Sequence, residues 1–390
     1  MALVGNPAAA EAVSTHGEVE AAISEVGDKL SAALGRGPDL LLIFLSAEHR
    51  EHAGLVLRRL QRRLSPDAVA GCTVSGAVGG GREFQNGPCL AAIGLRLPGT
   101  KVQAFHLGLD EEASVVHGWP DVGADSSVLL FPDPFSFPVE PFLESLRKQR
   151  ADLPAVVGGI ASGASRAGRN VLMTDDGLHE RGASGVVLRG GVRLEPIVAQ
   201  GTRPIGPLLE VTRCERNIVY ELGGKSAYEG LSEVLEGLEE EERRRFMRAP
   251  HVGLRPVKSS AGEDARDCLV RGVMGVDPEA GAIAIAEQVH DGLMLQFQAR
   301  DREAAHREIH ALLEMASSFH ANPVAALMFP CTGRGLHLFQ EADHDVAAVQ
   351  RHWPGLPVAG FFAAGEIGPV CGKPYVHGLS ASIGLLVPAE

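Results

Sequence analysis

The feature of this sequence that most constrains its fold is an internal repeat. Residues 39–98, 128–190 and 324–388 follow one order: an apolar strand, an amphipathic helical segment, a second short strand with a Gly-rich turn, and a closing strand. The interval from a phenylalanine in the first strand to a glycine in the second is similar each time: 27 residues from Phe44 to Gly71, 27 from Phe131 to Gly158, and 31 from Phe329 to Gly360. The matched intervals favour a structural repeat over a chance alignment of short apolar runs.

The helical segments between the repeated strands indicate the fold class. Leu57, Leu60 and Leu64 recur at the helical period in the first repeat, as Phe142 and Leu146 do in the second. Continuous apolar strands joined through a helix indicate parallel pairing, with helices covering the sheet. The sequence therefore predicts an α/β fold of mixed β-sheets flanked by helices, built from repeated strand–helix–strand units in two associated domains.

A different pattern separates the second and third repeats. Residues 208–222 are typical of a hairpin, and residues 225–247 predict a helix that ends in the charged run EEEERRRF. We place the domain boundary before this helix. The predicted organisation is an N-terminal helical extension at 1–37, a first domain at 38–223 and a second domain at 224–390.

Composition limits the partners and the compartment. The net charge of −13 argues against a nucleic-acid partner, because nucleic-acid binders more often have a basic surface. No apolar run approaches the ~18–20 residues of a membrane helix, and the start MALVGNPAAAEAV lacks the basic residues of a signal peptide. The six cysteines form no C-x-x-C pair, which argues against a zinc site and a disulfide framework. We expect a cytoplasmic protein that needs no metal or cofactor and no membrane.

Several motifs occur in an order that is typical of one family. They are GGIASG (158–163), GTRPIGP followed by VTR (201–213), NIVYELGGKSA (217–227), FPCTGRG (329–335) and GFFAAGEIGP (360–369), with HGLSASIGLLV after them. Together they resemble the FIST domain family, in which a FIST N domain is followed by a FIST C domain. The resemblance extends from about residue 38 onward, although FPC stands where FSC or FAC is more usual and KPYVHGLSAS lacks a fuller His-Asn-Thr signature.

The resemblance implies a sensory role. FIST domains occur in bacterial signal-transduction proteins beside kinase, chemotaxis or cyclic-dinucleotide output modules, where they are proposed to sense small ligands such as amino acids. In eukaryotes, a related pair follows an F-box and recruits substrates to a ubiquitin ligase. Because the sequence contains the two FIST regions and little else, we expect a stand-alone sensor that acts through a separate signalling protein.

The repeat also predicts where a ligand binds. Ligands of α/β sheets bind outside the carboxyl ends of the strands, and each repeat places a Gly-rich turn there. Glycines in such turns let backbone N–H groups approach a ligand closely. The candidate ligand-binding residues from these turns are Ser75, Gly159, Ser162, Cys331, Gly333 and Gly365. Arg203, in the GTRPIGP motif, is a further candidate.

One acid in these turns is unexpected. Glu366 lies in VAGFFAAGEIGP, where every other residue is small or apolar, and an unpaired buried charge is unfavourable. Arg334 follows another strand of the same repeat, so the two side chains can meet. As a structural ion pair they would fix the loops. As a binding pair, Glu366 would hold an ammonium group and Arg334 a carboxylate, which is what an amino acid requires.

Three functions are compatible with these observations. The first is small-ligand sensing without catalysis, with Glu366 and Arg334 as the main contacts. The alternative is a protein-interaction scaffold, as in the F-box relatives. The third is an enzyme based on Cys331, which lies beside a Gly-rich turn and Arg334. A catalytic thiol needs a base, and His337 or His377 would reach Cys331 only through the fold.

Overall fold

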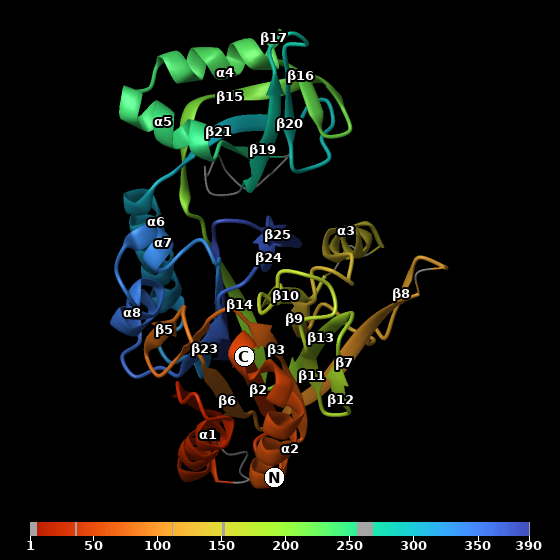
Figure 1. The fold of residues 1–390 in the computed structure, drawn as a ribbon, viewed down its shortest axis with the longest axis vertical. Helices are drawn as coiled ribbons and strands as arrows, with labels where there is room; N and C mark the ends of the chain where they lie inside the picture. Colours follow the sequence, from red (N-terminus) through yellow and green to blue (C-terminus); the bar gives the residue numbers. More distant parts are fainter. Residues whose placement is uncertain (1–5, 36, 111, 150–152, 256–267, 390) are drawn as a thin grey trace. The chain divides into compact units, whose positions relative to one another are not determined.

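The computed structural model describes residues 6–35, 37–110, 112–149, 153–255 and 268–389 (Figure 1). They form two compact units. The first unit contains the chain up to Ala199, Ile309–Val376 and the residues from Ser380 onward, and the second contains Gln200–Glu308 and His377–Leu379. The sequence boundary near residue 224 lies inside the second unit, and as a division between family domains it stays a prediction.

The three repeats form the same set of elements in the first unit. The first repeat is β2 (Leu40–Ser46), α2 (Ala53–Leu64), β3 (Ala68–Val74) and β6 (Leu90–Arg96); the second is β9 (Ser126–Pro132), α3 (Val139–Gln149), β10 (Ala155–Gly159) and β13 (Ala183–Gly190); the third is β22 (Ala325–Pro330), α8 (His344–His352), β23 (Val358–Phe361) and β26 (Ala381–Pro388). In each repeat the first two strands pair in parallel, and the closing strand pairs antiparallel with the first. The predicted fold class is confirmed.

Each of the three sheets is completed by a short hairpin from a different repeat. From the first repeat, β4 (Ala77–Gly79) and β5 (Arg82–Phe84) join β23 of the third. From the second, β11 (Leu172–Thr174) and β12 (Gly177–His179) join β3 of the first. From the third, β24 (Glu366–Val370) and β25 (Lys373–His377) join β10 of the second. The exchange of hairpins therefore runs once around the three repeats.

Further strands extend the other edge of each sheet. They are β1 (Ala8–Ser14) beside β6, β7 (Thr100–Asp110) beside β13 with β8 (Val115–His117) outside it, and β14 (Val192–Ala199) beside β26. The stretch predicted as a helical extension thus contains β1 in addition to α1 (Val19–Leu34). Burial alternates along β1, which is the pattern of an edge strand with one face on the core.

The repeated phenylalanines pack together in the core of the first unit. The ring centroids are 5.6 Å apart for Phe44 and Phe131, 5.7 Å for Phe131 and Phe329, and 6.4 Å for Phe44 and Phe329. All three side chains are fully buried, and they belong to one cluster with residues of all three sheets. The centre of the core is therefore where the three repeats meet.

The repeated glycines are required by the parallel pairing of the strands. A Cβ atom would lie 1.9 Å from the carbonyl oxygen of Ile43 at Gly71, 2.0 Å from that of Leu130 at Gly158, and 1.8 Å from that of Met328 at Gly360. No side chain fits at such distances, so each second strand approaches its partner only where it has glycine. The sequence interval from phenylalanine to glycine thus reports a real contact between strands.

The second unit is an antiparallel sheet that closes on itself. Its strands lie in the order β15 (Thr202–Glu215), β21 (Met294–Arg300), β18 (His251–Arg255), β19 (Leu269–Asp277), β20 (Ala282–Ile285), β16 (Ile218–Leu222) and β17 (Lys225–Ser226), and β15 also pairs with β16. The single helix predicted over 225–247 is wrong. This stretch forms two helices, α4 (Ala227–Glu236) and α5 (Glu240–Arg248), and Gly237 caps the end of α4 between them (Figure 1).

Three further helical segments connect these elements. α6 (Arg302–Phe319) begins in the second unit and continues into the first, and the short α7 (Leu336–Phe339) precedes α8. A 3-10 helix, η1 (Ala47–His52), leads into α2. In the part of the chain that the structure describes, no helix combines the length and the apolar character needed to cross a membrane.

Candidate functional site

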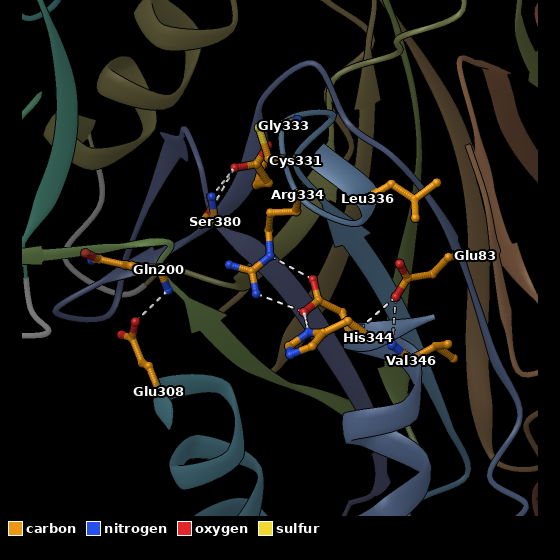
Figure 2. Close-up of polar contacts among 12 residues, drawn as sticks. Glu83, Gln200, Glu308, Cys331, Gly333, Arg334, Leu336, His344, Val346 and Ser380 are labelled. Carbon is orange, nitrogen blue, oxygen red and sulfur yellow. Dashed lines mark hydrogen bonds and ion pairs between the residues drawn. The ribbon is translucent and has the colours of Figure 1, made fainter. Parts of the chain in front are cut away.

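Glu366 lies at the start of β24, opposite Gly159 of β10, and is completely buried. Its Oε2 accepts hydrogen bonds from the backbone N–H of Ser380 at 3.0 Å and from the Ser380 hydroxyl at 2.7 Å (Figure 2). Its Oε1 is buried and has no hydrogen-bond partner among the residues that the structure describes. Burial raises the pKa of Glu366 to about 8, although Ser380, Cys331 and the charge of Arg334 favour the ionised form. The carboxyl group is therefore mostly protonated at neutral pH.

The two other repeats have apolar residues at the position of Glu366. In each repeat, the residue after the second-strand glycine pairs with the first residue of an exchanged hairpin. These pairs are Cys72 with Leu172, Gly159 with Glu366, and Phe361 with Ala77. Leu172 and Ala77 are as buried as Glu366. The fold thus accepts an apolar side chain at this position, and the carboxyl group of Glu366 has no counterpart in the other sheets.

Cys331 follows β22 and lies beside Glu366. Its N–H donates to the carbonyl of Ser380 at 2.9 Å, and its Sγ accepts a hydrogen bond from the N–H of Gly333 at 3.4 Å. The thiol is close enough to Glu366 to favour the ionised carboxylate. The thiol is half-buried, whereas the acid is fully buried. The predicted grouping of Cys331, Gly333 and Glu366 is therefore present in the structure.

The position of Cys331 carries a polar side chain in all three repeats. The equivalent residues are Ser46 and Asp133, each two residues after the repeated phenylalanine. Their N–H groups donate to the carbonyls of Cys89 and Gly182, as Cys331 does to that of Ser380. The Ser46 hydroxyl accepts from the Cys89 N–H, and Asp133 accepts from Ser136 and Asn170, so both have structural partners. Only the third repeat places a thiol here, next to a buried acid.

Arg334 is held by a carboxylate other than the one proposed from the sequence. Its Nε and Nη2 donate to Asp345 at 2.7 and 2.9 Å, and both side chains are buried. Burial opposes ionisation of Asp345, but Arg334 and His344 more than offset it and lower the pKa of Asp345 well below its usual range. The hypothesis of a Glu366–Arg334 ion pair is therefore wrong: the bidentate pair is Arg334–Asp345, and Glu366 feels Arg334 only as a nearby charge.

A second acid supports this pair from another repeat. Glu83 of β5 accepts hydrogen bonds from the N–H groups of Asp345 and Val346, at 2.8 and 2.9 Å, and so caps the start of α8 (Figure 2). Its other oxygen, Oε2, is buried, and no described residue forms a hydrogen bond with it. Burial and the charge of Asp345 raise the pKa of Glu83 to about 7. The exchanged hairpin that contains Glu83 thereby contacts the helix that holds Arg334.

The remaining turn residues meet, but their polar groups bond to the chain itself. The Ser75 N–H donates to the Ser162 hydroxyl at 2.9 Å, and Ser162 in turn donates to the carbonyl of Phe362. Gly365 accepts from the N–H of Ile160 at 2.8 Å. A Cβ atom on Gly159 would lie 2.8 Å from the Cβ of Ala363, so this glycine allows close packing. These residues position the turn that carries Glu366.

Arg203 belongs to a different set of contacts. It lies in the second unit, where its guanidinium forms ion pairs with Asp301, at 2.9 Å, and with Glu242. These two carboxylates account for its position in the second unit. The sequence placed it among the candidates only because of its motif.

Sequence reasoning missed three residues of the site: Ser380, Asp345 and Glu83. Ser380 lies in the HGLSAS motif, and its hydroxyl was a visible signal. Asp345 lies at the start of a helix, where acids are common because they interact favourably with the helix dipole, so its presence there did not indicate a partner for Arg334. Glu83 comes from a three-residue strand of another repeat, and no local pattern relates it to Arg334.

Comparison with known proteins identifies the family. Residues 39–225 match the FIST N domain and residues 227–369 match the FIST C domain. An uncharacterized protein of Mycobacterium tuberculosis strain H37Rv is 36% identical over 382 residues, which cover 96% of this chain and 98% of that protein. An uncharacterized protein of Mycobacterium bovis is 35% identical over 374 residues, covering 94% of this chain and 95% of the relative. The chain therefore belongs to the FIST family, with a FIST N domain followed by a FIST C domain.

Proposed function

We propose that this protein is a cytoplasmic sensor that binds a small ligand with an amino group, amino acids included, at Glu366. It passes the signal to a separate signalling protein and does not act as a catalyst in doing so. FIST domains are associated with sensory roles in signal transduction. One observation carries the choice of Glu366: it is a fully buried carboxyl group with one unpartnered oxygen, at a position that is apolar in both other repeats.

The buried Oε1 of Glu366 favours binding of a hydrogen-bond donor. A buried polar atom without a partner costs about 1–3 kcal/mol, and this fold has an apolar alternative at the same position. A ligand that donates a hydrogen bond to Oε1 removes this cost. Binding is therefore favoured, because the free protein has the unsatisfied oxygen and the bound protein does not. An ammonium group is the strongest such donor, because it also pairs with the ionised carboxylate.

The contacts of Arg334 narrow the class of ligand. Its bidentate site is filled by Asp345, so a ligand carboxylate needs an anchor other than this guanidinium. The amino group therefore supplies the recognised feature, and simple amines compete with amino acids for the site. The proposal thus differs from the amino-acid pairing of Glu366 with Arg334 that the sequence suggested.

A thermal-shift screen tests the proposal. The panel contains the common amino acids, the matching decarboxylated amines and the matching N-acetyl amino acids. A ligand at one hundred times its Kd adds about 2.7 kcal/mol of stability. We expect amines and amino acids to stabilise the wild type and the N-acetyl compounds to have no effect. Glu366→Gln and Glu366→Leu should abolish the response; the leucine variant copies the side chain of Leu172 at the equivalent position.

Proton release gives a second, independent test. With a pKa of about 8, the Glu366 carboxyl is about nine-tenths protonated at pH 7, so binding of an ammonium group displaces close to one proton. Calorimetric titrations in two buffers of different ionisation enthalpy measure this number. A stabilising amine that releases no proton, or that stabilises both Glu366 variants equally, would show that it binds elsewhere.

A further inference from the structure

One of the cysteines differs from the others in its surroundings. Burial raises the pKa of four thiols and so keeps them protonated: Cys72, Cys89, Cys214 and Cys268. Cys371 is exposed in the turn between β24 and β25. Cys331 is half-buried at the end of β22, with a backbone N–H donated to its sulfur and a buried acid beside it. Cys214 is also partly exposed, but its Sγ donates to the carboxylate of Asp291 at 3.3 Å, and burial and this acid together raise the pKa of the thiol. Cys331 differs because its sulfur accepts a backbone N–H and the acid beside it, Glu366, has a pKa raised by burial.

We propose that Cys331 is a redox modification site, at which a hydroperoxide oxidises the thiol and Glu366 accepts and returns the proton. Two observations carry the inference. The Gly333 N–H donates to Sγ at 3.4 Å, which favours negative charge on the sulfur. Glu366, whose buried Oε1 has no hydrogen-bond partner among the described residues, is joined to Cys331 through Ser380, which accepts from the Cys331 N–H at 2.9 Å and donates to Glu366 Oε2.

The reaction balances with these two side chains and the peroxide alone. The thiol proton passes to the Glu366 carboxylate, and the thiolate attacks the hydroxyl oxygen of the hydroperoxide. An S–O bond forms and the O–O bond breaks, so the sulfur loses two electrons and the peroxide gains them. The leaving alkoxide, or hydroxide in the case of hydrogen peroxide, takes the proton back from Glu366. The products are a sulfenic acid on Cys331 and an alcohol or water, with Glu366 unchanged.

The surroundings suit both proton transfers. A carboxyl group whose pKa has been raised by burial to about 8 is close to a thiol in proton affinity, so it can take the proton and return it. Ser380 fixes the carboxyl group through two hydrogen bonds to Oε2, which leaves Oε1 for this exchange. The charge of Arg334 is largely balanced by Asp345, so its effect on the pKa of Glu366 is smaller than the opposite effect of burial.

A hydroperoxide is the class of reactant that such a site can take. The thiol is only partly exposed, so the reactant must be small at its reacting end, and a hydroperoxide needs to bring only one oxygen to the sulfur. Its leaving oxygen needs one proton, which Glu366 supplies. This reactivity does not depend on the proposed amine ligand, although both use Glu366. The test therefore uses the protein without any added amine, so that failure of one proposal leaves the other standing.

The experiment compares two cysteines in the same molecule. The full-length protein is treated with hydrogen peroxide, the sulfenic acid is trapped with dimedone, and peptides containing Cys331 and Cys371 are quantified by mass spectrometry. We expect Cys331 to react at least about tenfold faster than the exposed Cys371 at pH 7. Glu366→Gln should reduce this ratio by about tenfold or more and leave the rate at Cys371 unchanged.

The pH profile separates proton transfer from a merely structural role. The reactive form has one proton shared between Cys331 and Glu366, so the wild-type rate should be bell-shaped in pH. In Glu366→Gln the rate should rise with pH as the thiol ionises and then level off. Glu366→Leu checks that the fold tolerates an apolar side chain in place of the acid; the equivalent position of another repeat has Leu172. Oxidation of Cys331 no faster than Cys371, or an unchanged ratio and pH profile in Glu366→Gln, overturns the proposal.

Discussion

Replacing Glu366 by glutamine tests the central claim about its environment, because the amide has nearly the same shape and cannot ionise. The pKa of this carboxyl rises from its ordinary 4.5 to about 8 in the folded protein. The folded state then binds the proton more tightly than the unfolded state. The stability that this provides is fully present below about pH 4.5 and is lost as the pH rises through about 8.

The magnitude follows from the two pKa values. Each unit of pKa difference corresponds to about 1.4 kcal/mol, so the Glu366 carboxyl lowers the free energy of unfolding by about 5 kcal/mol between pH 4 and pH 9. The loss is steepest between pH 5 and pH 8, at about 1.4 kcal/mol per pH unit. The stability of Glu366→Gln relative to the wild type should therefore increase across this window and level off above pH 8.

Tryptophan fluorescence during urea unfolding is a suitable assay. The chain has two tryptophans, Trp119 and Trp353, and both lie in the first unit with Glu366. The signal therefore reports the unfolding of this unit. Taking the difference between variant and wild type at each pH cancels the titration of other groups, including Glu83 and Asp345. A difference that stays constant from pH 5 to pH 8 would refute the reasoning, because it would mean that Glu366 ionises in the folded protein as it does in water.

Three further predictions concern the same unit and use the same unfolding assay. Gly158→Ala should destabilise the unit by several kcal/mol or prevent folding, since its Cβ would lie 2.0 Å from a carbonyl oxygen. The control Gly17→Ala, whose Cβ would have nothing within 4 Å, should change the free energy of unfolding by less than about 0.5 kcal/mol. Equal effects of the two variants would contradict the close contact at Gly158. Arg334→Met should cost about 3–5 kcal/mol because it leaves the buried Asp345 without its bidentate partner and with His344 as its remaining ion-pair partner. Adding Asp345→Leu should restore much of this loss; a double variant as unstable as the single one would show that the pair itself is required. Burial raises the pKa of Glu83 from 4.5 to about 7, so Glu83→Gln should remove a loss of stability that runs from about pH 4.5 to pH 7 while keeping the cap on α8; an unchanged pH profile would place the titration elsewhere.

The sequence predicted the repeated elements because two of their features are local. The apolar strands and amphipathic helices follow from periodicity. The phenylalanine-to-glycine interval follows from one close contact between parallel strands, as between Gly71 and Ile43, the residue before Phe44. The exchanged hairpins were not predicted. Their strands are as short as three residues, and their partners lie in other repeats, so no local pattern specifies the pairing.

The sequence predicted which strand ends meet at the candidate site but not which side chains form the ion pair there. The ends of repeated strands do converge, so Cys331, Gly333 and Glu366 were found together. The ion pair was misassigned because adjacency of strand ends does not determine where a long side chain points. Arg334 turns toward the start of α8, where Asp345 meets it.

The ring of exchanged hairpins has a consequence for synthesis on the ribosome. The sheet of the second repeat lacks one edge until β24 and β25 have been made, more than two hundred residues after β10. Until then β10 has an open edge, which is a template for pairing with other chains. The first unit therefore cannot complete its core before β24 and β25 are made, and the edge of β10 stays open in the nascent chain until Glu366 and the rest of the last hairpin emerge.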